Sequence, residues 1–202
     1  MHDYMRNYTV RKSLEFYMPI YAGVDKNDGA PMWYKPGFKG EAGYDYNPET
    51  MTKTYSDDLA QLTGKSQDAP HNGGFGFTAS WKGLSLNADF AFSLKKNMVN
   101  NDLMLAASSQ NAIAGCNQDK SMLHIWKRPG DLAELPGFQY QTQFDTHLLE
   151  NSSFLRLKNL TLSYDLPKQW MEATNFFDYI RFTFTARSVF TETKYKGADP
   201  EV

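Results

Sequence analysis

The chain has 202 residues and a formal net charge of −2, with no run of Lys or Arg that would mark a surface for nucleic acid or anionic lipid. Its apolar stretches are far shorter than the ~20 residues of a membrane-spanning helix. Aromatic residues make up 15 % of the chain, whereas Val and Ile together number nine, an unusual ratio for a soluble sheet whose core is built from β-branched residues.

The first predicted strand covers residues 13–22. Its apolar residues recur at every second position: Leu14, Phe16, Met18, Ile20 and Ala22. Pro19 removes one hydrogen-bond donor from its middle. Residues 25–29, Asp-Lys-Asn-Asp-Gly, lack the ligand spacing of a calcium loop and are interpreted as a turn. A short strand is expected near residues 31–34.

The most regular alternation covers residues 73–95, in two halves separated by Lys82-Gly83. A two-residue connection ending in Gly is typical of a β-hairpin with a primed turn. With these residues as the loop, all apolar pairs share one face: Trp81 with Leu84, Ala79 with Leu86, Phe77 with Ala88, and Phe75 with Phe90. The turn and the hydrophobic pattern therefore predict the same register, and Asn87 and Asp89 fall on the opposite, polar face.

Two further strands are expected at residues 154–164 and 179–190. The apolar phase of the first changes between Leu157 and Leu160, which a β-bulge near Lys158-Asn159 would reconcile. The second strand places both Arg181 and Arg187 on its polar face. A membrane barrel would impose this phase, because Arg on the lipid side at mid-bilayer costs roughly 2–4 kcal/mol.

The connections alternate between short turns and long tracts, at about residues 36–72 and 96–152. This asymmetry is typical of outer-membrane barrels, which have short periplasmic turns and long extracellular loops. We therefore predict an all-β fold, an antiparallel transmembrane β-barrel fragment whose long extracellular loops contain short helices.

Several segments, in this order, carry a resemblance to a known family: residues 21–25 leading to Gly29 and Trp33-Tyr34, residues 73–75, 80–86, 126–131, 153–164 with Leu166-Pro167, and 193–201. Their order over nearly the whole chain resembles the SusC/RagA-like TonB-dependent outer-membrane transporters, specifically the C-terminal part of their β-barrel. The resemblance implies about six strands of a 22-stranded barrel.

The resemblance also implies import of oligosaccharides or peptides across the outer membrane of a Gram-negative, Bacteroidetes-like bacterium. It implies a SusD-like surface lipoprotein as a partner, and the TonB complex as a second partner through the N-terminal part of such proteins. We expect residues 1–202 to be a partial C-terminal barrel from which the plug domain and the final strand are absent. We expect contact with outer-membrane lipid, no nucleic-acid partner and no cofactor.

We expect the polar face of the strands to line the lumen through Asn87, Asp89, Arg181 and Arg187. Aromatic residues in or beside the long tracts are candidate substrate contacts, with loop packing as the alternative: Trp33, Tyr34, Tyr44, Tyr46 and Trp126.

The sequence contains no nucleophile elbow, P-loop or dinucleotide fingerprint. Its four His residues lack a paired metal spacing, and its one Cys excludes an internal disulfide. We therefore expect neither enzyme activity nor catalytic or metal-binding residues. The alternative function is that of a soluble or secreted β-sandwich that binds carbohydrate through its loop aromatics.

Overall fold

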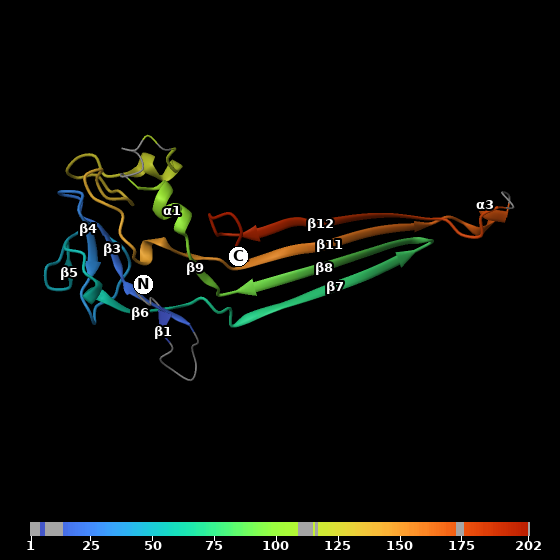
Figure 1. Cartoon of the computed structure of the whole chain (residues 1–202), viewed down its shortest axis with the longest axis horizontal. Helices are drawn as coiled ribbons and strands as arrows, with labels where there is room; N and C mark the ends of the chain where they lie inside the picture. Colours follow the sequence, from blue (N-terminus) through green and yellow to red (C-terminus); the bar gives the residue numbers. More distant parts are fainter. Residues whose placement is uncertain (1–4, 7–13, 109–114, 116, 173–175, 202) are drawn as a thin grey trace. The chain divides into compact units, whose positions relative to one another are not determined.

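A computed structural model of the chain describes residues 5–6, 14–108, 115, 117–172 and 176–201 (Figure 1). The chain divides into two compact units. The sheet unit comprises Ala69–Lys95, Ser152–Tyr195 and Pro200–Val202, and the loop unit comprises Met1–Asp68, Lys96–Asn151 and Lys196–Asp199.

The sheet unit is built on four antiparallel strands in the order β12-β11-β8-β7 (Figure 1). Their bounds are His71–Trp81 for β7, Leu84–Leu94 for β8, Phe154–Asp165 for β11 and Arg181–Thr193 for β12. With 11, 11, 12 and 13 residues, they exceed the usual strand of ~5–6 residues and reach the ~9–11 of a tilted membrane strand.

The predicted hairpin is confirmed in its turn and in its register. Lys82 and Gly83 connect β7 to β8 with φ angles of 45° and 88°, the positive values that a type I′ turn requires. Trp81 lies opposite Leu84, and the predicted pairing continues to Phe75 opposite Phe90. A short local pattern was sufficient to predict the pairing of these strands, because a two-residue turn fixes their register.

The predicted bulge in β11 is also confirmed. Leu157 lies opposite Phe90 and Asn159 lies opposite Asp89, so β11 has one residue more than β8 at Lys158. A second bulge, which the sequence analysis missed, lies beside it in β12. Leu157 pairs with Phe190 and Asn159 with Arg187, and Ser188 within this stretch has a φ of 50°. The two bulges together keep most apolar residues of the four strands on one face, whereas Phe154 lies in the phase of Arg156.

The prediction of one strand over residues 13–22 is wrong. The structure has β2, Glu15–Pro19, and β3, Tyr21–Val24, in different sheets. β2 pairs with β1, Met5–Arg6, and with β6, Ala60–Ser66. β3 pairs with β4, Pro31–Tyr34, and β4 pairs with β5, Met51–Thr52. At Ile20 the chain leaves one sheet and enters another. A local alternation of apolar residues does not show this change, because the pairing partners are distant in sequence.

The alternating residues of 14–22 nevertheless supply the core of the loop unit. Phe16 and Met18 are buried with Leu149 in one cluster, against which Val99 and Phe144 pack. Ile20 and Ala22 are buried with Met32 and Tyr34 in a second cluster, completed by Met51. The hydrophobic period therefore identified four buried side chains, those of Phe16, Met18, Ile20 and Ala22, although it merged two strands, and Leu14 is only half-buried.

The long tract from about 36 to 72 contains β5, β6 and the 3-10 turn η1, Asp57–Leu59. The tract 96–152 contains a two-stranded pairing of β9, Asn97–Val99, with β10, Leu149–Asn151. It also contains the helix α1, Asn101–Ala106, and the 3-10 turns η2, Lys120–His124, and η3, Thr146–Leu148.

The last connection, between β11 and β12, contains the short helix α3, Lys168–Glu172. Antiparallel sheets with a few short helices in the long tracts confirm the predicted fold class. The sheet runs from β12 to β7 without closing on itself in the described part of the chain. No helix within the described ranges is long and apolar enough to cross a bilayer.

Candidate functional site

The sheet unit has one polar and one apolar face, and together they form the candidate functional site. The polar face is assigned from the strand register, which aligns the following residues: Thr78, Ser80, Ser85, Asn87, Asp89, Arg156, Asn159, Thr161, Ser163, Asp165, Arg181, Thr183, Thr185 and Arg187.

Hydrogen bonds between neighbouring strands confirm that these side chains share a face. The hydroxyls of Ser80 and Ser85 lie 3.1 Å apart, and those of Ser163 and Thr183 lie 3.2 Å apart. Asn87 donates to the Thr78 hydroxyl at 3.1 Å. The middle of the polar face is therefore lined by hydroxyl and amide groups that also remain available to water.

Charged residues occur at two levels of the polar face. At the end near the hairpin turn, Arg181 donates from Nε and Nη2 to the Asp165 carboxylate at 2.5 and 2.8 Å. At the level of the two bulges, Asn159 donates to Asp89 at 3.2 Å and lies opposite Arg187 on its other side. Bulges re-aim side chains locally, so this second level combines opposite charges with an amide between them.

All four residues predicted to line a lumen, Asn87, Asp89, Arg181 and Arg187, lie on this one face. Asp165, the partner of Arg181, was not among the predicted residues. The signal was available, because Asp165 continues the polar phase of residues 159–163, but pairing it required the register between β11 and β12.

The apolar face carries the residues of the opposite phase: Phe75, Phe77, Trp81, Leu84, Leu86, Phe90, Leu157, Leu160, Leu162, Tyr164, Phe182, Phe184 and Phe190. The Phe75 and Phe90 rings stack with their centroids 4.9 Å apart, as expected of a directly opposed pair. Phe182 and Phe184 are 64 % and 66 % exposed, and Trp81 is 69 % exposed.

An exposed apolar face of this extent marks an interaction with lipid or another apolar surface. A sheet that presents hydroxyl, amide and charged groups on one side and aromatic rings on the other can separate water from hydrocarbon. That is the physical task of a barrel wall.

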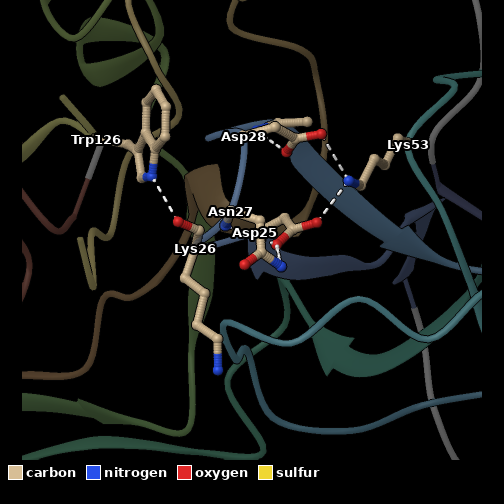
Figure 2. A network of polar contacts seen from close by, with 7 residues as sticks. Asp25, Lys26, Asn27, Asp28, Lys53 and Trp126 are labelled. Atoms are coloured by element: carbon tan, nitrogen blue, oxygen red, sulfur yellow. Dashed lines mark hydrogen bonds and ion pairs between the residues drawn. The ribbon is translucent and has the colours of Figure 1, made fainter. Parts of the chain in front are cut away.

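In the loop unit, the predicted turn at residues 25–29 is confirmed and is the centre of a polar network (Figure 2). The buried Asp25 carboxylate accepts hydrogen bonds from the backbone and side chain of Asn27, both at 2.9 Å. Figure 2 shows Lys53 reaching between Asp25 and Asp28, with Nζ 2.5 and 2.7 Å from their carboxylates.

These contacts keep Asp25 and Lys53 charged. Burial by itself raises the pKa of Asp25, but the hydrogen bonds from Lys53 and Asn27 outweigh it and hold the pKa below its ordinary value. Burial by itself lowers the pKa of Lys53, but its bonds to Asp25 and Asp28 raise the pKa above the ordinary value. The network is a salt bridge that fixes the turn.

Trp126, one of the predicted substrate contacts, packs on the same turn. Its indole Nε1 donates to the Lys26 carbonyl at 3.1 Å (Figure 2). A Cβ on Gly29 would lie only 2.3 Å from the Trp126 ring, so a glycine is required for this approach. Trp126 therefore anchors residues 126–131 to the turn.

The other four aromatic residues divide into buried and accessible pairs. Trp33 and Tyr34 lie in the expected short strand, β4, and they are 2 % and 7 % exposed, so both pack into the loop unit. Tyr44 and Tyr46 are each 37 % exposed, and Lys53 Nζ lies 4.6 Å from the Tyr46 ring centroid. Of the five candidate residues, only Tyr44 and Tyr46 have exposed side chains.

A buried carboxylate that the sequence analysis missed holds Trp33 in place. Asp145 accepts from Trp33 Nε1 at 2.6 Å and from the His147 backbone at 2.9 Å, and His147 Nδ1 lies 2.6 Å away. The adjoining cavity measures about 10 Å³, room for one water molecule. Across the described ranges, no group of His, Cys, Asp and Glu is placed to hold a metal ion.

Comparison with known proteins gives relatives of one kind. A TonB-dependent receptor P3 of Formosa agariphila is 25 % identical over 129 residues, which is 63 % of this chain and 12 % of the relative. The solved RagAB peptide transporter is 43 % identical over 93 % of this chain, with a TM-score of 0.80. The RagAB peptide importer in its open-open and closed-closed states gives the same identity and coverage, with TM-scores of 0.80 and 0.79.

These comparisons confirm the predicted resemblance to SusC/RagA-like TonB-dependent transporters. The chain spans 20 % of each solved transporter chain and 12 % of the curated receptor. The relatives are described as a receptor and a transporter rather than as enzymes. No model of a known protein family matches the chain.

Proposed function

We propose that this chain forms part of the barrel wall of an outer-membrane TonB-dependent transporter for nutrient uptake. Its apolar face contacts lipid, and its polar face lines the passage through Asn87, Asp89, Arg181 and Arg187. The observation that carries the proposal is the separation of polar from apolar residues across four strands of 11 to 13 residues, maintained through two bulges.

The length of the apolar face supports the same assignment. Along β8 it extends from Leu84 to Phe92, about 26 Å at the usual strand rise of ~3.3 Å per residue. A strand tilt of ~40° reduces this to about 20 Å across the membrane, close to the ~25 Å apolar band of such barrels. Trp81, Tyr164 and Phe182 lie at one end of the band, where barrels carry an aromatic girdle.

A soluble β-sandwich is less consistent with the sheet. Such a fold buries the apolar face of each sheet against a second one. Phe182 and Phe184 are more than half exposed, which in water would cost the hydrophobic free energy that normally drives sandwich formation.

The transported material is proposed to be peptide. The resemblance alone left oligosaccharides and peptides open, and the solved relatives at 43 % identity are described as a peptide transporter and importer. We further propose a SusD-like surface lipoprotein and the TonB complex as partners of the full-length protein. Tyr44 and Tyr46 are the proposed aromatic substrate contacts, because their rings remain accessible.

Cysteine labelling of adjacent residues tests the wall assignment. Thr183 and Phe184 are neighbours on β12 but belong to opposite faces. In the full-length protein in intact outer membranes, a charged maleimide should label Thr183→Cys much faster than Phe184→Cys. A lipid-soluble maleimide should show the reverse preference. Equal labelling of both positions by the charged reagent would contradict a wall.

Substrate class is tested separately by uptake. Cells lacking the gene should lose import of labelled peptide mixtures and retain import of neutral oligosaccharides, and the wild-type gene should restore peptide import. Loss of oligosaccharide import alone would overturn the peptide assignment while leaving the wall assignment intact.

A further inference from the structure

The arginines on the polar face of the sheet unit differ in whether a carboxylate neutralises them. Arg181 donates two hydrogen bonds to Asp165, at 2.5 and 2.8 Å. Arg156 donates from Nη1 to Oε2 of Glu201, in the same unit, at 2.7 Å, and its side chain is only 12 % exposed. Arg187 is exposed, and within the described part of the chain no carboxylate binds its guanidinium. Arg187 is therefore available to an anion from outside the sheet.

Asp89, at the same level of the polar face, is a carboxylate that no cation neutralises among the described residues. It is half-buried, and its Oδ2 accepts from the Asn159 amide at 3.2 Å. Its Oδ1 lies beside the opposing Gly76, where a Cβ would approach it to 2.6 Å. The amide on one side and the glycine on the other thus fix the position of the carboxylate without cancelling its charge.

The strand order keeps these two charges apart. Asp89 lies on β8 and Arg187 on β12, with β11 between them. Asn159 lies opposite both residues. Two strand spacings of ~4.8 Å separate the two backbones by about 10 Å. Water and salt weaken the attraction between charges at this distance, so each charge can bind a group of a ligand.

We propose that Asp89 and Arg187 form a two-charge docking position for a peptide that carries an ammonium group and a carboxylate about 10 Å apart. Arg187 binds the carboxylate, because its planar guanidinium can donate two parallel hydrogen bonds to one carboxylate, and Asp89 binds the ammonium group. The docking position rests on the proposed function, since it requires the polar face to line the passage of a peptide transporter.

Import of four synthetic peptides by cells that carry the full-length protein tests the docking position. The peptides have one length, acetylated and amidated ends, and differ only at two positions three residues apart. These positions hold Lys and Glu, Lys and Gln, Gln and Glu, or two Gln, and an extended peptide places them about 10 Å apart. The Lys-Glu peptide should reach half-maximal import at a concentration about tenfold lower than either singly charged peptide, the effect of one additional charge-assisted contact.

Two variants assign each charge of the peptide to one residue. Arg187→Gln should abolish the difference between the Lys-Glu and Lys-Gln peptides and keep that between the Lys-Glu and Gln-Glu peptides. Asp89→Asn should have the opposite effect. As a matched control, Lys82→Asn removes a cation from the hairpin turn, where Asn suits the positive φ, and should leave both differences unchanged. Comparing peptides within one variant removes the effect of its amount in the membrane.

The outcomes separate this docking position from the proposed function. Equal half-maximal concentrations for all four peptides, or differences that persist in both Arg187→Gln and Asp89→Asn, would overturn the docking position while peptide import stands. Import of none of the four peptides would overturn the peptide assignment and the docking position together. Neither result would bear on the wall, which the Thr183 and Phe184 labels test.

Discussion

Lys53 shows how single residues stabilise the loop unit. It follows β5 and reaches Asp25 and Asp28 in the turn at residues 25–29. The Asp25 side chain is 3 % exposed and that of Lys53 is 28 % exposed, so removing the cation leaves a buried carboxylate without its strongest partner. A buried ionised group without a partner is costly, which makes this pair more important than a surface salt bridge.

Lys53→Met should lower the free energy of unfolding of the loop unit by about 2 kcal/mol. The lowered pKa of Asp25 contributes stability that is present above the ordinary carboxyl pKa and lost as the pH falls through the folded value. The raised pKa of Lys53 contributes stability that is lost only as the pH rises through its folded value, above 10.5. Urea unfolding should therefore show a constant deficit between about pH 5 and 9 that shrinks below about pH 4. A deficit that grows on acidification would contradict this account.

Gly29 can be tested against a matched glycine. Gly29 and Gly37 both have positive φ, at 70° and 90°, but only Gly29 faces a neighbour, the Trp126 ring. Gly37→Ala should cost about 1 kcal/mol of backbone strain. Gly29→Ala should cost about 3 kcal/mol or more, because the strain is joined by a clash within a packed contact. Protease cleavage near Trp126 should increase in Gly29→Ala alone, and equal effects of the two changes would argue against the Trp126 anchor.

At the scale of elements, the two bulges decide whether the strands can form a wall. Strand residues alternate between faces, so a slip of one residue moves every later side chain to the other face. In β11 the apolar positions are Leu155 and Leu157 before the bulge and Leu160, Leu162 and Tyr164 after it. In β12 the residue that indicates a bulge in the sequence is Ser188, a polar residue at a position of the apolar phase. Its positive φ confirms that the bulge lies there.

Deleting Lys158 removes the bulge residue and tests this dependence. Without Lys158, the residues Leu155, Leu157, Leu160, Leu162 and Tyr164 alternate strictly and stay on one face, so the full-length protein should assemble and keep heat-modifiable migration in gels of outer membranes. Lys158→Ala keeps the chain length and should assemble normally, although it weakens the Glu201 contact. Deleting Thr161 instead, beyond the bulge, moves Ser163 and Asp165 to the lipid side and should abolish assembly, and equal assembly of the two deletions would show that the phase of β11 does not matter.

At the scale of the whole molecule, the sheet unit has an apolar face suited to lipid and a polar face suited to water. Both of its described edges, β7 and β12, present unpaired strand positions within the described part of the chain. Open edges of this length associate with other strands. The chain covers only 20 % of the solved transporters, and we therefore expect the remaining strands of the full-length protein to cover both edges.

Adjacent arginine substitutions test the two-solvent arrangement. Ala186 lies midway along the apolar face, and Thr185 lies beside it on the polar face. Ala186→Arg should cost roughly 2–4 kcal/mol and reduce assembled protein in the outer membrane, because the charge enters hydrocarbon. Thr185→Arg should assemble at nearly the parent level. If both variants assembled equally, Ala186 would not face lipid.

The sequence by itself determined the hairpin, the β11 bulge, the fold class and the face on which Asn87, Asp89, Arg181 and Arg187 lie. These follow from a period of two and from turn geometry, which act within a few residues of the chain. Only the tertiary structure decided that residues 13–22 form two strands, that Trp33 and Tyr34 are buried, and that Glu201 binds Arg156 and Lys158. Each of these depends on a partner distant in sequence, and local patterns do not specify which distant segment supplies it.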